Sequence, residues 1–353
     1  ANHNKMVENI SFSGKWMGLL EISDDKMKLH LTLITLLIIL TISFLYLYQS
    51  GLFRPDLLFR EEYQQQSITK RPEHIIYVLP AGGARQLSWI SPVVQTLSRQ
   101  GLNPTLIIGS SGGAIMGTAL AQGESTKSIS HTWKDISKSY YGRTPPPQAQ
   151  WGVIGYIYRL RKLEKIFPDL NEKLIGFLNF EQLIKSNTGL IINAAHSNNR
   201  DPHLFIINVD DESLPPASSY SHIESQKNLE TALQASSAIP GFLPPVTWYE
   251  KEFIDGSFSQ PTDLKTSLDV AGSLEAKTLI VYIDANSPRR ILSPPTYRQT
   301  ILLNQIEEKY PQQAILVIRP ETVLPGGDYL AEILTIEKAA RESAKGAVTF
   351  LKW

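Results

Sequence analysis

Short apolar runs alternate with longer stretches of helical periodicity along most of the chain. Runs at 74–80 and 105–109 read as buried strands, and a helix from Ser88 and a second, small-residue helix follow them. This alternation is typical of an α/β fold. Further strands are predicted at 189–194, 204–209, 253–254, 278–284 and 314–319, and a long helical pattern covers 329–353.

The longest apolar run covers residues 29–48 and contains no charged side chain. A helix of this length rises about 30 Å, which is the thickness of the hydrocarbon layer of a bilayer. We therefore predict a transmembrane anchor, with Tyr46 and Tyr48 at the far interface. No Ala-x-Ala-type cleavage site follows the run, which favours an uncleaved anchor over a signal peptide, and a buried core helix is the alternative.

The anchor divides the chain into segments. Residues 1–28 form an N-terminal tail, residues 49–73 form a glutamine-rich linker, and residues 74–353 form the catalytic domain. Positive charges on the two sides of the span are nearly balanced, so the side of the membrane that carries the catalytic domain stays open.

A long stretch without strand patterns covers residues 123–187. Within it, apolar residues at helical spacing over 153–167 share the helix with four basic residues. The favoured interpretation is a surface helix that packs one apolar face on the core. A basic amphipathic helix that lies on an anionic bilayer is the alternative.

The composition narrows the function. The 353 residues carry 34 basic and 34 acidic side chains. Because there is no excess of positive charge, the composition does not indicate a nucleic-acid partner. The chain has no cysteine, which excludes disulfides, thiolate zinc sites and acylation at cysteine within it. No metal-binding or nucleotide-binding motif occurs, so we expect neither a metal nor a cofactor.

The pattern Gly-x-Ser-x-Gly occurs where the strand at 105–109 meets the small-residue helix. A turn this sharp places Ser111 on a nucleophile elbow, because Gly109 and Gly113 lack side chains that would collide across it, and Gly112 relaxes it further. The N–H groups that follow point toward a developing oxyanion. Ser110 is the poorer nucleophile, because an isoleucine stands two residues before it. A plain strand-to-helix turn is the alternative.

A second small-residue turn, from Ala81 to Arg85, follows the strand at 74–80. Gly82 and Gly83 have no Cβ to keep a substrate oxygen away from the backbone N–H groups. The turn therefore looks like an oxyanion loop. The alternative is a flexible connection with a solvated Arg85.

A third feature is a short apolar run that leads into Asp255-Gly256. The segment Ala-Ser-Ser-Ala-Ile-Pro at 235–240 lies before it in the chain. Together with the two small-residue turns, these segments stand in the order and approximate spacing found in patatin-like phospholipases. The resemblance spans about residues 74–350. It implies a three-layer α/β fold related to the α/β hydrolases and a Ser/Asp dyad that works without histidine.

The resemblance also assigns roles to residues. It implies Ser111 as the nucleophile, Asp255 as its base, and Gly82, Gly83 and Ala84 as the N–H donors of the oxyanion hole. Arg85 would then orient the loop or meet a lipid phosphate.

The chain departs from the family pattern at four positions. Ala81 and Gln86 stand in the oxyanion loop where the family usually has glycine, and Ser257 and Gln260 replace the glycine and asparagine that usually follow Asp-Gly. Backbone donors survive such changes when φ stays negative, so we expect the site to be intact.

Histidine-based alternatives carry no motif. No histidine lies beyond Asp255, so a Ser–acid–His order would need a partner from the loop-rich stretch after residue 196. The candidates there are Asp201, Asp210 or Asp211 as the acid and His203 or His222 as the base. Asp284, at the end of a strand, is a rival acid for the dyad, but strand-terminal aspartates are more often turn or cap residues.

The sequence thus predicts a membrane-anchored serine acyl hydrolase whose partners are a lipid substrate and the membrane, and which cleaves carboxylic esters of phospholipids or lysophospholipids. Two alternatives remain. The same site could serve another esterase or an acyltransferase, or the departures from the family pattern could mark a lipid-binding protein without turnover.

Overall fold

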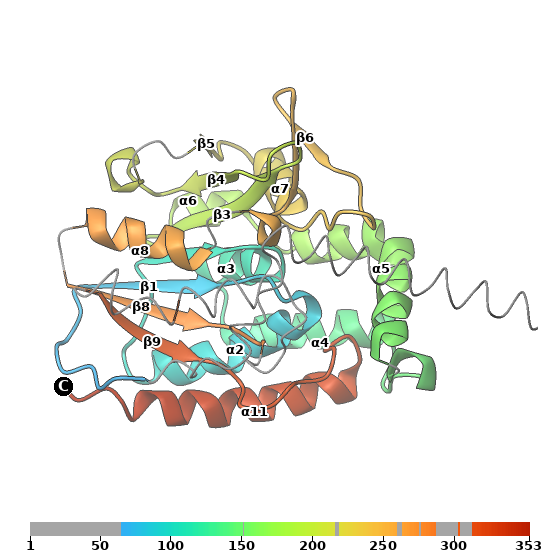
Figure 1. The fold of residues 1–353 in the computed structure, drawn as a ribbon, viewed down its shortest axis with the longest axis horizontal. Coiled ribbons are helices and arrows are strands. Elements are labelled where there is room, and N and C mark those ends of the chain that lie inside the picture. Colours follow the sequence, from blue (N-terminus) through green and yellow to red (C-terminus); the bar gives the residue numbers. More distant parts are fainter. Residues whose placement is uncertain are drawn as a thin grey trace, which may run out of the picture. The chain divides into compact units, whose positions relative to one another are not determined.

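The computed structural model describes residues 65–150, 152–215, 219–259, 263–274, 277–286, 303 and 313–353. Their strands form one sheet, in the order β5-β4-β3-β2-β1-β8-β9 with the hairpin β6–β7 attached to β3 (Figure 1). From β3 to β9 along this order all neighbours are parallel, and β4 is antiparallel to β3. This confirms the expected α/β class. The strands are β1 (His74–Leu79), β2 (Leu106–Gly109), β3 (Gly189–His196), β4 (Pro202–Ile207), β5 (Ser219–His222), β6 (Val246–Trp248), β7 (Lys251–Asp255), β8 (Thr278–Ile283) and β9 (Ala314–Ile318).

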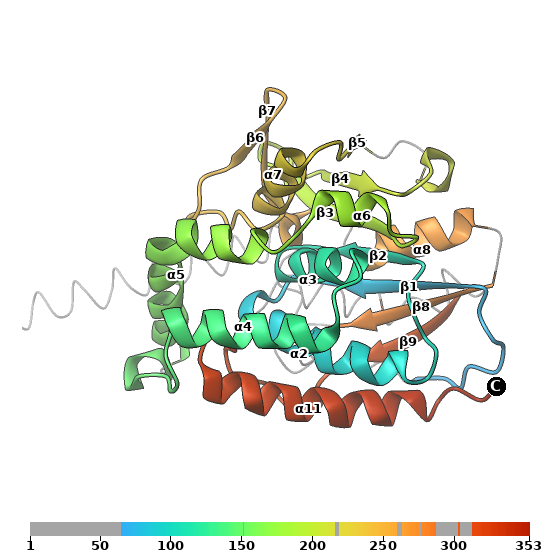
Figure 2. The ribbon, with the colours of Figure 1, turned by 180° about the vertical axis from the view of Figure 1, so that it is seen from behind.

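Helices cover both faces of this sheet and make the fold three-layered. In Figure 1 α8 lies on the near face, and Figure 2 shows α2, α3, α4 and α11 on the other. The helices are α2 (Gly83–Ser98), α3 (Gly112–Ala121), α4 (Thr126–Tyr140), α5 (Gly152–Ile175), α6 (Phe180–Ile184), α7 (Gln226–Ser236), α8 (Asp263–Ser273) and α11 (Leu330–Val348), with short 3₁₀ turns η3 (Pro147–Gln150), η4 (Asp211–Ser213) and η5 (Gly256–Phe258).

The central strands are apolar throughout because both of their faces are buried. In β1, Ile76 and Val78 pack into the apolar cluster under α8, while Tyr77 and Leu79 pack into the larger cluster under α2 and α11. Side chains of a strand alternate between its faces, so a continuous apolar run fills both layers. Because β1 and β2 are parallel neighbours, their carboxyl ends lie side by side, with Leu79 opposite Gly109.

Some elements differ from the sequence-based predictions. The helix expected from Ser88 begins at Gly83, because the small-residue turn is its first turn and not a separate loop. Strand β7 extends from Lys251 to Asp255, beyond the two apolar residues that predicted it. The strands β5 and β6 were not predicted, since both are short and β5 is a run of polar residues without apolar alternation.

The first described residues are joined to the far end of the chain. Ile68 forms a parallel bridge with Leu351, and the Gln65 side chain hydrogen-bonds the backbone of Ile315 and Val317 in β9. Residues 65–68, which the sequence places in the linker, therefore take part in the packing of the catalytic unit. The predicted anchor at 29–48 lies outside the described residues. Within them, no helix combines the length and the apolar character that crossing a bilayer requires.

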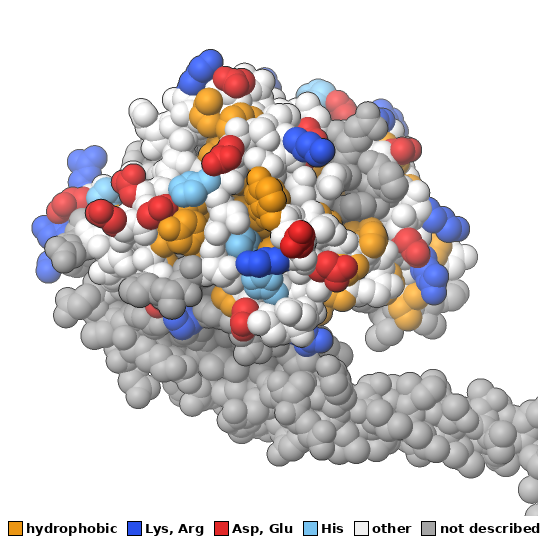
Figure 3. Space-filling model, turned by 90° about the horizontal axis from the view of Figure 1, so that it is seen from above, with side chains coloured by type: hydrophobic (Ala, Val, Ile, Leu, Met, Phe, Trp, Pro, Cys, Tyr) orange, Lys and Arg blue, Asp and Glu red, His pale blue; other side chains and the backbone are white. Residues whose placement is uncertain are grey.

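Helix α5 contains the basic amphipathic stretch. Leu163 and Ile166 pack against the main apolar cluster, as a surface helix requires, whereas Ile157 and Tyr158 are exposed. The face in Figure 3 carries acidic, basic and histidine side chains between separate apolar patches. This mixture fits a chain whose formal net charge is zero.

Candidate active site

Ser111 occupies a strained turn between β2 and α3. Its backbone has φ 53° and ψ −127°, a conformation that residues with a side chain rarely adopt. Its carbonyl accepts the N–H groups of Ala114 and Ile115 at 3.0 and 3.2 Å, which fixes it at the start of the helix. Strain of this kind marks sites where a side chain is held in a set direction, as at a nucleophile elbow.

Close backbone contacts explain the glycines around this serine. A Cβ at Gly109 would lie 2.8 Å from the carbonyl carbon of Gly113, and a Cβ at Gly113 would overlap the Leu79 carbonyl oxygen. A Cβ at Gly112 would lie 2.8 Å from the Gly83 carbonyl oxygen. The elbow therefore packs against both β1 and the first turn of α2.

The Ser111 hydroxyl lies near the side chain of Asp255, the last residue of β7, and influences the pKa of its carboxyl. Residue Ala194 of β3 is the register partner of Asp255, and β3 adjoins β2, so neighbouring strands bring the two side chains together. Asp255 is buried. Burial raises the pKa of its carboxyl, while hydrogen bonds from Ser257 and from the Ser111 hydroxyl act in the opposite direction. The structure thus brings Ser111 and Asp255 near each other, and their roles as nucleophile and base stay predictions.

Backbone hydrogen bonds hold both members of this pair. The Asp255 N–H donates to Ala238 at 2.9 Å, and one carboxylate oxygen accepts the Ser257 N–H at 2.8 Å. On the other side, the Ser111 N–H donates to the hydroxyl of Ser236 at 2.9 Å. The segment around residues 235–240 therefore binds the backbone N–H groups of both Ser111 and Asp255.

The predicted oxyanion loop is the N-terminus of α2. Gly82 is the N-cap, and Gly83 has φ 54°, which glycine adopts without strain. The N–H groups of the first residues of a helix have no acceptor within the helix, so Gly83 and Ala84 present free donors there. The helix dipole adds positive potential at the same place. The contact between Gly83 and Gly112 brings these donors beside the elbow.

A family model for patatin-like phospholipases matches residues 77–266 of the chain, which is more than half of it. The chain belongs to the patatin-like phospholipase family. As a member of it, the chain is a lipid acyl hydrolase. The matched residues include the elbow, the oxyanion loop and Asp255.

Solved structures with a related fold include proteins from bacteria and human. VipD from Legionella pneumophila is 13% identical, with 82% of this chain and 71% of that chain covered and a TM-score of 0.40. The type III effector ExoU of Pseudomonas aeruginosa is 16% identical, with 79% and 53% covered and a TM-score of 0.36. Human GIVD cytosolic phospholipase A2, in complex with a fluorophosphonate inhibitor, is 13% identical, with 78% and 58% covered and a TM-score of 0.39. At these scores the assignment rests on the family model alone. A comparison with curated protein sequences finds no match.

Residues that depart from the patatin-like pattern take part in the support of the oxyanion loop or of Asp255. The Gln86 side chain donates to the Ile283 carbonyl at 2.6 Å and accepts the Ala285 N–H at 2.8 Å, which ties α2 to the end of β8. The Ala81 carbonyl accepts a bond from the Asn286 side chain at 3.3 Å. Ser257 supplies the N–H that binds Asp255. Gln260 lies outside the described residues.

Arg85 is buried and turned toward the protein. Its guanidinium donates to the Pro325 carbonyl at 2.7 Å and to the Asn286 side chain at 3.1 Å. These bonds favour the first of its two predicted roles, orientation of the loop. Next to it, a Cβ at Gly327 would lie 2.8 Å from the Arg85 backbone, so the segment before α11 packs directly against the loop.

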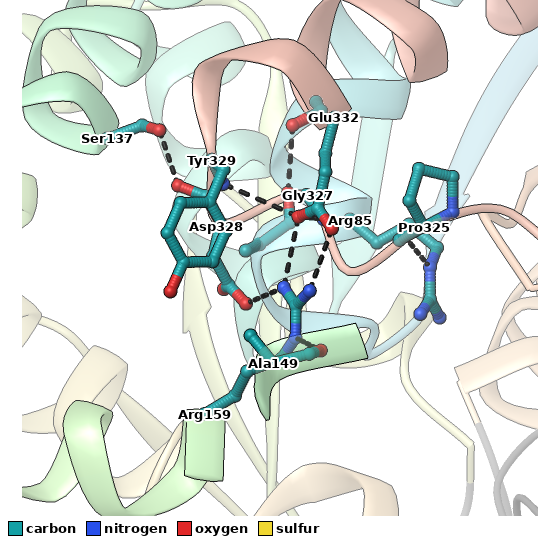
Figure 4. A network of polar contacts seen from close by, with 11 residues as sticks. Arg85, Ser137, Ala149, Arg159, Pro325, Gly327, Asp328, Tyr329 and Glu332 are labelled. Carbon is teal, nitrogen blue, oxygen red and sulfur yellow. Dashed lines mark hydrogen bonds and ion pairs between the residues drawn. The ribbon is translucent and has the colours of Figure 1, made fainter. Parts of the chain in front are cut away.

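A partly buried ion network holds that segment in place (Figure 4). Arg159 of α5 contacts Asp328 at 2.5 Å and Glu332 at 2.7 Å, and also donates to the Ala149 carbonyl. Glu332 in turn accepts the Gly327 N–H at 3.0 Å. The network therefore connects α5, α11 and the segment that supports the oxyanion loop.

The rival catalytic groups lie elsewhere. His222 of β5 pairs with Asp211 of η4 at 3.1 Å, and both side chains are exposed. Strand β5 is three strands from β2, which is about 14 Å at the usual strand spacing. His203 contacts the hydroxyls of Ser219 and Ser221 instead. Asp284 accepts the Tyr282 hydroxyl and the Asn286 N–H at 2.9 Å, as a strand-end anchor does.

Three polar residues near the elbow were missed by the sequence analysis as site residues. Ser236, Asn193 and Asp263 are all buried within this part of the fold. Asn193 was the most visible of them, because it interrupts the apolar run of β3. Among the described residues, no group of three His, Cys, Asp or Glu side chains could hold a metal ion.

Proposed function

We propose that the chain hydrolyses carboxylic ester bonds of phospholipids or lysophospholipids, with Ser111 as nucleophile and Asp255 as general base. The observation that carries the proposal is the approach of the Ser111 hydroxyl, at a strained elbow, to the buried Asp255 carboxyl, close enough to lower the pKa of that carboxyl. A serine hydroxyl is a weak nucleophile near neutral pH and needs such a base within hydrogen-bond reach.

In the acylation half, Asp255 takes the hydroxyl proton of Ser111 while the Ser111 oxygen attacks the ester carbonyl carbon. The tetrahedral oxyanion is held by the N–H groups of Gly83 and Ala84 at the start of α2 and by that of Gly112 at the start of α3. Collapse of this intermediate breaks the ester bond, and the leaving alkoxide takes the proton from Asp255. An acyl-serine and an alcohol result.

Deacylation repeats the steps with water. Asp255 removes a proton from a water molecule as its oxygen attacks the acyl-serine, and the same donors hold the second oxyanion. When the bond to Ser111 breaks, its oxygen regains the proton from Asp255. The fatty acid leaves, and the site returns to its first state.

The environment of Asp255 suits this work. A carboxylate with an ordinary pKa near 4 is a poor base for an alcohol. Burial raises the pKa of Asp255 and so increases its affinity for the serine proton. The departures leave the support of the site in place, since the backbone groups of Ala81 and Ser257 and the side chain of Gln86 all make hydrogen bonds there. This favours turnover over a role in binding alone.

A fluorophosphonate probe tests the proposal, because it labels only an activated serine. We expect the wild-type chain to be labelled at Ser111, and Ser111→Ala to lose both the label and the release of fatty acid. Ser128→Ala is the matched control, since Ser128 is exposed on α4. A folded Ser111→Ala chain that keeps most of its activity would disprove the assignment. Acyl products formed with added alcohols would identify a transferase.

We also propose that residues 29–48 anchor the enzyme in a membrane and hold the site beside its lipid substrate. An apolar span of this length binds a bilayer far more strongly than a surface helix does. The full chain is expected to stay with membranes at high pH, while a chain starting at Glu61, upstream of the contacts of Gln65, is released. That chain should keep its activity on short soluble esters and lose activity mainly on bilayers. Release of the full chain by carbonate would refute the anchor.

A further inference from the structure

A second buried carboxylate lies behind the elbow. Asp263 is the first residue of α8 and is 3% exposed. Its Oδ1 atom accepts the hydroxyl of Ser110 at 2.6 Å and the side-chain N–H of Asn193 at 2.9 Å. The mechanism above does not use this group. Burying a carboxylate costs free energy unless it is hydrogen-bonded, and the Ser110 and Asn193 donors offset part of that cost.

Ser110 and Asn193, the two donors, lie next to the nucleophile and next to the strand partner of the base, respectively. Ser110 is the residue directly before the nucleophile. Asn193 stands in β3 next to Ala194, the register partner of Asp255, and the Asn193 carbonyl accepts the hydroxyl of Ser236 at 2.7 Å. Ser236 in turn binds the N–H of the nucleophile, as described above.

The turn at Gly256, which follows the proposed base Asp255, packs against both Asn193 and Ser110. A Cβ at Gly256 would overlap the Asn193 carbonyl oxygen and would lie 2.7 Å from the Ser110 hydroxyl. The hydroxyl of Ser259 accepts a second bond from the Asn193 side chain at 3.1 Å and donates to the Gly256 carbonyl at 2.7 Å. Asp263 therefore stands where the elbow, β3 and the Asp255–Gly256 turn meet.

We propose that Asp263 is a positioning residue for the acyl-transfer site, which fixes the elbow to the Asp255–Gly256 turn through Ser110 and Asn193 and places its own charge behind the base. The proposal rests on the function proposed above. It adds a residue that acts on the geometry and the basicity of the dyad without touching substrate.

The charge of Asp263 couples to that of Asp255. Burial raises the pKa of Asp263 to about 6, the bonds from Ser110 and Asn193 act against this rise, and the charge of Asp255 adds to it. Two buried carboxylates that repel each other titrate as a pair. Because such repulsion is mutual, the negative charge of Asp263 in turn favours uptake of a proton by Asp255 and makes it a stronger base.

The other groups around Asp263 leave this coupling in place. The side chains of β1 and β2 that face α8 are apolar and include Val78 and Ile108. From β8, the Tyr282 hydroxyl is buried, and its pKa is raised by burial first and then by Asp284, with Asp263 contributing less. The N-terminus of α8 itself favours the negative charge on Asp263.

Two substitutions separate the hydrogen bonds from the charge. Asp263→Asn keeps an Oδ1 acceptor for both donors, whereas Asp263→Ala removes it. We expect Asp263→Ala to lose about 10- to 100-fold in kcat with KM nearly unchanged, because a small displacement of the dyad slows chemistry without affecting binding. Asp263→Asn should lose less than about threefold in kcat near pH 7.5. Asp269→Asn, on the same helix and paired with Lys265, is the matched control.

The pH profile is a readout that a purely structural role would not change. As pH rises through about 6, Asp263 ionises in the wild type and strengthens Asp255 as a base, so kcat/KM should rise more steeply through this range in the wild type than in Asp263→Asn. A profile of this variant that matches the wild type overturns the proposal, even if Asp263→Ala fails to fold. Unchanged kcat in a folded Asp263→Ala chain overturns it too. If Ser111→Ala retains activity, the proposed function itself has failed, whatever the Asp263 variants do.

Discussion

The Ser111 N–H donates to the Ser236 hydroxyl across 2.9 Å. The amide of the nucleophile is therefore occupied by the protein and does not face the substrate. This leaves the oxyanion to the N–H groups at the starts of α2 and α3. It also gives Ser236 a defined task, which is to hold the strained backbone of Ser111 in the direction that points its side chain at Asp255.

Replacement of Ser236 by alanine should slow catalysis by about tenfold in kcat, because the buried Ser111 N–H loses its acceptor and the elbow can rotate. The change in KM should be small. Steady-state kinetics on a dispersed ester measure both. Ser237→Ala is the neighbouring control, since the Ser237 hydroxyl bonds only backward along α7, to Leu233 and Gln234. Equal losses in the two variants would contradict this role.

A methyl group at Gly113 should prevent correct packing of the elbow. Its Cβ would overlap the Leu79 carbonyl and lie 2.8 Å from that of Pro80, and backbone cannot move aside as a side chain can. We expect Gly113→Ala to lower stability by about 2 kcal/mol or more and to abolish activity. Denaturant unfolding measures the first effect. Gly346→Ala, which meets only open space inside α11, should instead leave stability unchanged or raise it by about 0.5 kcal/mol.

Asp255→Asn should separate activity from stability. Loss of the base lowers kcat by about 10³-fold. In the folded chain burial raises the pKa of Asp255 above its unfolded value, so the acid form is favoured there, and ionisation destabilises the fold as pH rises through the raised pKa. The variant should therefore have a higher Tm than the wild type at pH 8, and the difference should vanish toward pH 4.

The same shift predicts that wild-type kcat/KM falls as pH drops through the raised pKa of Asp255, at a pH above the usual range of an aspartate. Asp135→Asn, exposed on α4, should change neither the profile nor the Tm. A Tm for Asp255→Asn below that of the wild type at every pH would show that burial of this charge does not govern stability.

Loss of Arg159 should weaken the fold and the site together. Arg159→Gln leaves the buried Glu332 and the partly buried Asp328 without their partner, which costs about 3 kcal/mol in comparable ion networks. Since Glu332 binds Gly327 and Gly327 packs on Arg85, kcat should fall as well. Urea denaturation and steady-state kinetics measure the two effects. Arg161→Gln removes an exposed charge on the same helix and should change stability by less than about 0.5 kcal/mol. A similar result for both arginines would refute the network.

The sequence predicted the parts of the site that depend on local geometry. Gly109 is required by a backbone contact with Gly113 within one strand–turn–helix unit, whereas Gly113 is required by a contact with Leu79 of β1. The spacing of these two glycines nevertheless indicated the elbow at Ser111. Asp255 needed the family resemblance, since its approach to Ser111 depends on the pairing of β7 with β3. Pairing of distant strands leaves no local pattern in a single sequence.

The supporting residues were beyond prediction for the same reason. Asp263 reaches Ser110 across 153 positions of the chain, and Gln86 reaches Ile283 across 197. In the sequence, both Asp263 and Gln86 look like ordinary polar residues of a helix, because their partners come near only in the folded structure. The start of α2 was predicted too late because two glycines usually end regular structure, whereas here Gly83 begins a helix with positive φ.

The contact between Gly83 and Gly112 has a consequence for attempts to alter the enzyme. The turn that carries the nucleophile and the turn that carries the oxyanion donors share one backbone contact, with no side chain between them to absorb a change. An added atom at Gly112 therefore moves both turns together. Variation of substrate preference, in nature or in the laboratory, has to come from the surrounding segments, because the two turns behave as a single rigid part.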